Sequence, residues 1–230
     1  MIQTDHQFTL AADIADQNDY TALVLLHSYR EHAPRDVSKF EQDQPKPVRR
    51  HVILHVERWR HIGYPEQVRR IVERFEEVRG HVAGLNLRNP RLELVVDATG
   101  LGRPILDSLR EANLRPRGIV ITGGGDAASK RDGITTVPKQ TLATTLQVVL
   151  QSQRLRLADD VSLDEVLYRE LHGFRVKVTL SGHARFGNDV GAWREAEHDD
   201  LVLAVALGVW AAEHRNIADL RQLRAASGLA

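Results

Sequence analysis

Hydrophobic positions in the first half of the chain follow the spacing of β-strands before they follow that of a helix. Apolar residues dominate 8–14 and 21–26, and the turn-forming residues 16–19 lie between them, which predicts two strands joined as a hairpin. Residues 51–57 alternate between apolar and polar and predict a third strand. From Pro65 onward, apolar residues recur at helical spacing, so a helix is expected after the third strand.

The second half of the chain alternates between strands and helices. An apolar strand at 92–97 ends in an acid, and a glycine-containing turn leads into a helix around 105–109. A further strand follows at 118–122. Strand, helix and strand in this order predict a right-handed parallel crossover.

Together these elements predict an α/β fold, with a mixed five-stranded sheet that is antiparallel at one edge, parallel at the other and flanked by helices. Three later segments are predicted to be helical: Pro138 to about Leu150, Ser162 to Leu171, and Asp200 to about His214. Residues 174–186 alternate in hydrophobicity around a Ser-Gly pair and predict an extra C-terminal β-hairpin. We expect residues 1–215 to form one domain and 216–230 to form a weakly helical or disordered tail.

Composition narrows the chemistry that the chain can carry. The absence of cysteine excludes thiolate zinc sites and cysteine nucleophiles, and it is typical of a reducing cytoplasm. Lys and Arg number 31, as do Asp and Glu, so the chain as a whole lacks a strongly basic charge. The first residues do not resemble a signal peptide, and no apolar run approaches the ~20 residues of a membrane span. A cytoplasmic protein without membrane contact is expected.

Acidic residues occur at the ends of several predicted elements. Asp13 and Asp97 each lie at or near the end of a strand, and Asp199 and Asp200 open the last helix. If the first and fourth strands are neighbours, these acids converge at one edge of the sheet, where their mutual repulsion favours a bound Mg²⁺ or Mn²⁺. The alternative interpretation is that the strand-end acids are turn residues and the acid pair caps a helix.

Basic residues form local clusters that are candidates for binding phosphate groups. The candidates are Lys130 and Arg131 after a glycine run, Lys139 at the start of a predicted helix, and Arg175, Lys177 and Arg185 on the predicted hairpin. The alternative is that most of them belong to solvated surfaces.

Five short segments, taken in order, resemble those of a known family. They are Ala12-Asp13-Ile14-Ala15 with Asp19-Tyr20-Thr21-Ala22, then Val95 to Gly100, Val137-Pro138-Lys139, Tyr168-Arg169-Glu170-Leu171, and His198-Asp199-Asp200-Leu201-Val202-Leu203-Ala204. In order and spacing, from about Phe8 to His214, the chain resembles the C-terminal nuclease domain of phage terminase large subunits.

The resemblance implies a ribonuclease H-like fold and a metal-dependent endonuclease that cuts concatemeric DNA during genome packaging. Asp13 matches the family's first-strand acid, Asp97 its fourth-strand acid, and Asp199 with Asp200 its final pair. Two Mg²⁺ or Mn²⁺ ions are implied, with Asp200 favoured as the direct ligand because related resolvases place an acid just before the same helix. Asp199 then binds the second metal or holds water.

The chain departs from the family in one respect and leaves alternative functions open. It has no phosphate loop of the ATPase motor that terminase large subunits carry, so we expect either an isolated nuclease domain or a motor on a separate chain. The implied partners are double-stranded DNA and such a motor, a small terminase subunit or a portal, in the host cytoplasm for a phage or prophage protein. The alternatives are a Holliday-junction resolvase-like nuclease and a non-catalytic packaging protein that binds DNA or a portal.

Overall fold

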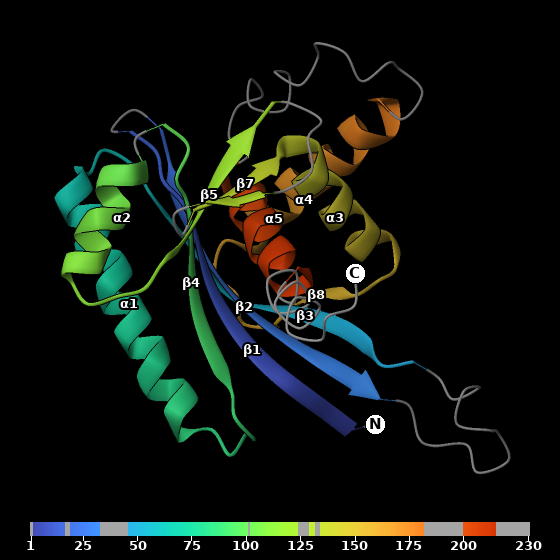
Figure 1. The fold of residues 1–230 in the computed structure, drawn as a ribbon. Helices are drawn as coiled ribbons and strands as arrows, with labels where there is room; N and C mark the ends of the chain where they lie inside the picture. The colour runs from blue at the N-terminus through green and yellow to red at the C-terminus, as the bar shows by residue number, and fades with distance from the viewer. Residues whose placement is uncertain are drawn as a thin grey trace, which may run out of the picture.

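A computed structural model places most of the chain in a single mixed sheet with helices on both faces (Figure 1). It describes residues 2–16, 19–32, 46–100, 102–123, 129–131, 134–181 and 200–214. The strands are β1 (Ile2–Asp13), β2 (Thr21–His32), β3 (Val48–Trp59), β4 (Arg91–Asp97), β5 (Arg117–Thr122), β6 (Ser129–Arg131), β7 (Ile134–Pro138) and β8 (Leu155–Leu157). The predicted tail at 216–230 lies outside the described residues.

In the described part of the chain, eight strands pair in the order β6-β7-β5-β4-β1-β2-β3-β8. The hairpin strands β1, β2 and β3 pair antiparallel, whereas β4 pairs parallel with β1, and β5 pairs parallel with β4. A core order of β3-β2-β1-β4-β5 with only β2 reversed is the ribonuclease H-like arrangement. The mixed sheet and the parallel crossover are therefore confirmed.

The sheet has more strands than the predicted five. The strands β6, β7 and β8 are additional, and they contain only three to five residues each. Segments this short show too few alternating positions to be recognised from hydrophobicity. Strand β7 pairs parallel with β5, and β6 pairs antiparallel with β7 at that edge of the sheet. Strand β8 pairs parallel with β3 at the opposite edge.

The helices form two layers, one on each face of the sheet (Figure 1). Helices α1 (Tyr64–Gly84) and α2 (Gly102–Glu111) cover one face, and α3 (Lys139–Gln151), α4 (Asp164–Ser181) and α5 (Asp200–Glu213) lie on the other. Successive side chains of β1 point to opposite faces of the sheet and pack in both layers. Leu10 and Ala12 pack in the core under α1 and α2, whereas Ala11 packs in the core that contains α5.

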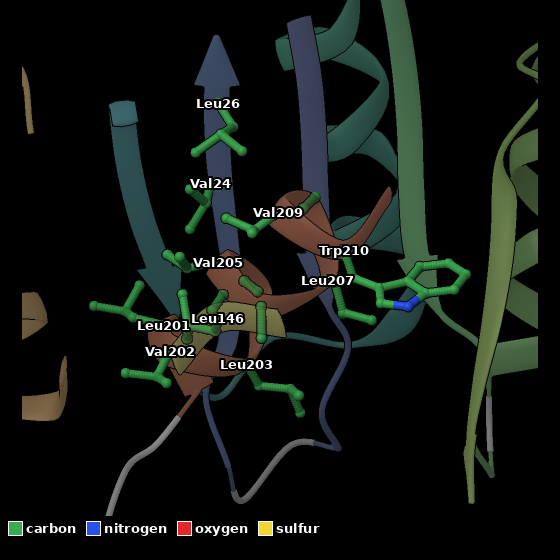
Figure 2. Close-up of a cluster of buried hydrophobic side chains, with 14 of the residues drawn as sticks. Val24, Leu26, Leu146, Leu201, Val202, Leu203, Val205, Leu207, Val209 and Trp210 are labelled. Carbon is green, nitrogen blue, oxygen red and sulfur yellow. The ribbon is translucent and has the colours of Figure 1, made fainter. Parts of the chain in front are cut away.

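Helix α5 is the centre of the second layer. All residues from Leu201 to Ala212 are buried, because the sheet lies on one side of the helix and α3 and α4 contact it as well. Figure 2 shows Val24 and Leu26 of β2 beside the apolar side chains of α5, including Val205 and Val209. A helix that is apolar all round is the expected solution for this position. No helix in the described ranges combines the length and the apolar character that a membrane span requires.

The predicted C-terminal hairpin at 174–186 is wrong over its first arm. Helix α4 continues to Ser181, so residues 174–181 are helical, and the rest of the segment lies outside the described residues. The alternating residues of this arm also belong to a helical series, Leu167, Leu171, Phe174 and Val178, with spacings of four, three and four. A helix already begun at Asp164 continues at low cost, because each further residue adds a hydrogen bond without new nucleation.

Candidate functional site

Pairing in the sheet brings Asp13 and Asp97 to the same level of two adjacent strands. Ala12 of β1 is paired in parallel register with Val96 of β4, and each acid is the next residue of its strand. Adjacent strands lie about 4.8 Å apart. The two acids are therefore neighbours at the carboxyl ends of parallel strands, as the sequence predicts.

Both acids face the layer that contains α5. Side chains alternate along a strand, and Ala11 and Val95, two residues before each acid, belong to the core cluster of α5. Asp13 is 8% exposed and Asp97 is 3% exposed. Two carboxyl groups thus lie side by side in a largely buried position under the same helix.

Backbone donors orient the acid of β4. Asp97 Oδ1 accepts a hydrogen bond from the amide of Thr99 at 2.8 Å, and Thr99 Oγ1 accepts one from the amide of Ile121 at 2.9 Å. The amide of Ala98 also donates to the carbonyl of Ile119 at 2.7 Å. The turn after β4 is therefore tied to β5, which limits the directions that the Asp97 carboxylate can take.

The segment after Asp13 is held by a glutamine from α1. Gln67 Nε2 donates to the carbonyl oxygens of Ala15 and Ile62, each at 3.1 Å, and its Oε1 accepts from the hydroxyl of Thr21 at 2.9 Å. That hydroxyl in turn accepts from the amide of Ala15 at 3.0 Å. Gln67 is almost fully buried, so these bonds form away from competing water.

Asp200 is the first residue of α5, and a buried acid from α4 holds the start of that helix. Glu170 is 8% exposed, and its Oε2 accepts from the amide of Val202 at 3.2 Å. A carboxylate at this position satisfies a free backbone donor and is stabilised by the positive end of the helix dipole. Glu170 Oε1 also lies 3.6 Å from Arg58 Nη1 on β3.

A buried lysine adds positive charge on the same side of the sheet. Lys139 is 9% exposed and begins α3 directly after β7, sharing the inward face of that helix with Leu142 and Leu146. Strands β7, β5, β4 and β1 run parallel, so the residue after β7 lies at the same edge of the sheet as the two strand-end acids. In the register of these strands, Asp97 is level with Ile119 and Thr135, four residues before Lys139.

The structure brings together only part of the predicted site. Asp13 and Asp97 are neighbours and Asp200 begins the helix above them, whereas Asp199 lies outside the described residues. Among the residues that are described, no group of three His, Asp or Glu side chains is arranged to hold a metal ion. The complete ligand set therefore stays a prediction.

The predicted phosphate-binding residues are scattered over several elements. Lys130 and Arg131 lie in β6 instead of a loop, Arg175 and Lys177 lie in α4 instead of a hairpin, and Arg185 is outside the described residues. Lys139 is the member of this set that is buried after the carboxyl end of a strand parallel to those of the acids. Sequence reasoning did not assign Gln67 or Glu170 to the site, although Glu170 belongs to one of the segments that carry the family resemblance.

Comparison with known proteins finds similar solved structures. No family model matches the chain, and no curated protein matches it. The large terminase nuclease from thermophilic phage G20c is 16% identical with a TM-score of 0.44, and the match covers 89% of this chain and 81% of that one. The Mn-soaked terminase nuclease domain of human cytomegalovirus is 13% identical with a TM-score of 0.43, covering 90% and 85%. Both are terminase nuclease domains, the family that the sequence segments resemble.

Proposed function

We propose that residues 1–215 form a metal-dependent DNA endonuclease of the terminase type, which cuts concatemeric DNA during packaging of a phage genome. One observation supports this most directly: Asp13 and Asp97 are buried side by side at the ends of parallel strands, beneath the helix that Asp200 begins. Neighbouring buried carboxylates are destabilising by themselves, and a divalent cation relieves their repulsion.

The donor set fits Mg²⁺ or Mn²⁺. Carboxylate oxygens are the ligands that these ions prefer, and Asp13, Asp97 and Asp200, with Asp199, would hold two of them. When bound, such ions activate water and stabilise the leaving oxygen of a phosphodiester. Hydrolysis adds water across the phosphodiester: the bond between phosphorus and the 3′ oxygen breaks, and a 5′ phosphate and a 3′ hydroxyl remain.

Other residues of the chain keep the acids in place. The hydrogen bonds of Thr99 hold the end of β4, and the side-chain hydrogen bonds of Gln67 hold the segment after β1. Glu170 accepts a hydrogen bond from the first turn of α5. Lys139 offsets part of the negative charge before a substrate phosphate arrives. The substrate is double-stranded DNA in the cytoplasm, and a motor, small terminase subunit or portal would be supplied by other chains.

A plasmid-cutting assay tests the proposal. Purified protein is incubated with supercoiled plasmid and Mg²⁺ or Mn²⁺, beside D13N, D97N and the control D107N. Asp107 lies on the exposed surface of α2 and pairs with Arg110. We expect the wild type and D107N to nick and linearise the plasmid. D13N and D97N should cut ~100-fold more slowly or worse, because losing a ligand should cost at least as much activity as losing a residue that supports one, which costs up to ~100-fold.

Two results would contradict this function. If the wild type leaves the plasmid intact with either metal, or if D13N and D97N cut as fast as D107N, these acids do not carry a nuclease reaction. Preferential cutting of four-way junctions over linear duplex would instead assign the same site to a resolvase-like enzyme.

A further inference from the structure

One arginine, Arg58, lies on the row of the sheet that contains the acids. Asp13 of β1 is paired with Ala22 of β2, and Ala22 is paired with Arg58 of β3. The row across four strands is therefore Arg58, Ala22, Asp13 and Asp97. At about 4.8 Å per strand, the backbone of Arg58 lies roughly 10 Å from that of Asp13.

Arg58 faces the same layer as the acids. Val56, two residues earlier in β3, belongs to the core cluster of α5, so Arg58 extends from the same face of the sheet. Its side chain is 20% exposed, and its Nη1 atom is buried. Two residues further along, Arg60 follows the end of β3 and is exposed.

Tyr20 holds the two guanidinium groups together. The Cζ atom of Arg58 lies 4.4 Å from the centre of the Tyr20 ring, and that of Arg60 lies 5.3 Å from it. Tyr20 is partly exposed and comes just before β2, in the connection that follows Asp13. Two like charges thus lie close to one aromatic ring, where cation–π attraction offsets part of their repulsion.

The ion pair of Arg58 is longer than those on the arginine-rich face of α1. On α1, Arg69 and Arg74 lie within normal hydrogen-bonding distance of glutamates, at 2.6 Å from Glu66 and 2.8 Å from Glu57. Arg58 instead lies 3.6 Å from Glu170, beyond hydrogen-bond length, and that glutamate already accepts a bond from Val202. Arg58 is therefore held less closely by its glutamate than Arg69 and Arg74 are by theirs.

From this placement we infer that Tyr20, Arg58 and Arg60 form a phosphate-binding group for the DNA strand that reaches Asp13 and Asp97, an inference that rests on the proposed function. Guanidinium groups bind phosphate oxygens in bidentate fashion, and phosphate contacts fix the register of a nucleic acid on its protein. A distance of roughly 10 Å corresponds to about three nucleotides of axial rise along one strand. The group thus binds the backbone a few nucleotides away from the cut.

DNA binding measured without cutting tests this inference. A fluorescently labelled short linear duplex is titrated with the full chain in Ca²⁺ over a series of KCl concentrations, for the wild type, R60Q and the double variant R58Q/R60Q. We expect Kd to rise by ~10-fold or more in the double variant. The slope of log affinity against log salt should fall by about 1 for each DNA phosphate that the variant no longer neutralises.

Two controls separate a binding defect from a folding defect. R79Q removes an exposed arginine that pairs with Glu76 on α1, beyond the opposite face of the sheet, and should leave both Kd and slope unchanged. R60Q keeps Arg58 beside the buried Glu170, so its thermal unfolding should change less than that of the double variant while its salt slope falls.

The outcomes distinguish failure of the phosphate-binding group from failure of the proposed nuclease function. If the protein cuts plasmid DNA but R58Q/R60Q binds the duplex with wild-type affinity and slope, the phosphate-binding group is wrong and the nuclease stands. If the wild type neither binds nor cuts DNA, the proposed function fails and this inference fails with it. Equal losses in R79Q and R60Q would show only a general charge effect and would also overturn it.

Discussion

Gln67 determines the course of the chain after Asp13, although the two residues are far apart in the sequence. Its side chain joins α1 to the carbonyl of Ala15 and to the hydroxyl of Thr21, on either side of the connection between β1 and β2. The bond to Thr21 is buried and the bond to Ala15 is partly buried, and buried hydrogen bonds are costly to lose because the groups left behind have no water to replace the partner.

We therefore expect Q67L to destabilise the protein by about 2–3 kcal/mol, since it leaves buried carbonyl and hydroxyl groups without their amide partner. Urea denaturation measures the change. The control Q151L makes the same substitution at the exposed last residue of α3 and should change stability by less than about 0.5 kcal/mol. Equal effects from the two variants would mean that the Gln67 bonds contribute nothing specific.

Residues of the site divide by whether their role depends on local or distant partners. The adjacency of Asp13 and Asp97 could be predicted because each ends an apolar strand, and parallel neighbours bring their ends together. Gln67 and Glu170 could not be assigned, because their partners are the backbone groups of Ala15 and Val202, which only the folded chain brings near. A polar residue on a helix has the same local pattern whether it faces water or the interior.

At the scale of elements, the position of α5 depends on a close approach to the sheet. A Cβ atom added at Gly208 would lie 3.3 Å from the Cβ of Ala11 and 3.7 Å from the nearest side-chain atom of Leu26. The glycine therefore lets the helix pack tightly over β1 and β2, the strands that carry one acid and its hairpin partner.

A pair of glycine substitutions isolates this packing. Both G208A and G80A gain helix propensity, worth about 0.5–1 kcal/mol, but the added methyl at Gly80 on α1 meets nothing within 4 Å. We expect G80A to be stabilising, and G208A to be less stable than G80A by about 1–2 kcal/mol because the tight contact forces α5 away from the sheet. Thermal unfolding of both variants measures the difference, and equal stabilisation would show that the sheet accommodates the methyl.

Long, strongly patterned elements could be predicted, and short or ambiguous ones could not. The strands β1 to β5 and the helix that Asp200 begins were all recognisable from hydrophobic spacing. The arm at 174–181 satisfies both a two-residue and a helical period, and continuation of the helix already begun at Asp164 decides between them.

At the scale of the whole molecule, a buried polar network joins the far end of α5 to the sheet. His51 of β3 is fully buried and is hydrogen-bonded through Nδ1 to Ser28 Oγ at 2.8 Å and through Nε2 to Glu213 Oε1 at 2.9 Å. Arg154, just before β8, also pairs with Glu213 and donates to the carbonyl of Arg49. Helix α5 is thus held by Glu170 near its first turn and by Glu213 at its last residue.

The charges of this network make stability depend on pH in a defined direction. Burial lowers the pKa of His51, and the nearby Arg154 and Arg49 lower it further against the opposing effect of Glu213. Burial raises the pKa of Glu213, but His51 and Arg154 outweigh it and lower the pKa to about 2. For both groups the unfolded chain binds a proton more readily than the folded one, so stability falls as the pH falls.

We expect the free energy of unfolding to decrease from pH 6.5 downward as His51 becomes protonated in the unfolded chain, and further between pH 4.5 and 2 because of Glu213.

The variant E213Q should lose about 1.5–3 kcal/mol of unfolding free energy at pH 7, where Glu213 is a charged acceptor. Its stability should approach that of the wild type as the pH falls below 4.5, where Glu213 of the unfolded chain is itself neutral. Urea denaturation at a series of pH values measures both curves, with E111Q at the exposed end of α2 as the control that should run parallel to the wild type. A constant difference between E213Q and the wild type from pH 7 to pH 3 would exclude ionised Glu213 as the source of the stabilisation, because a purely packing role does not titrate.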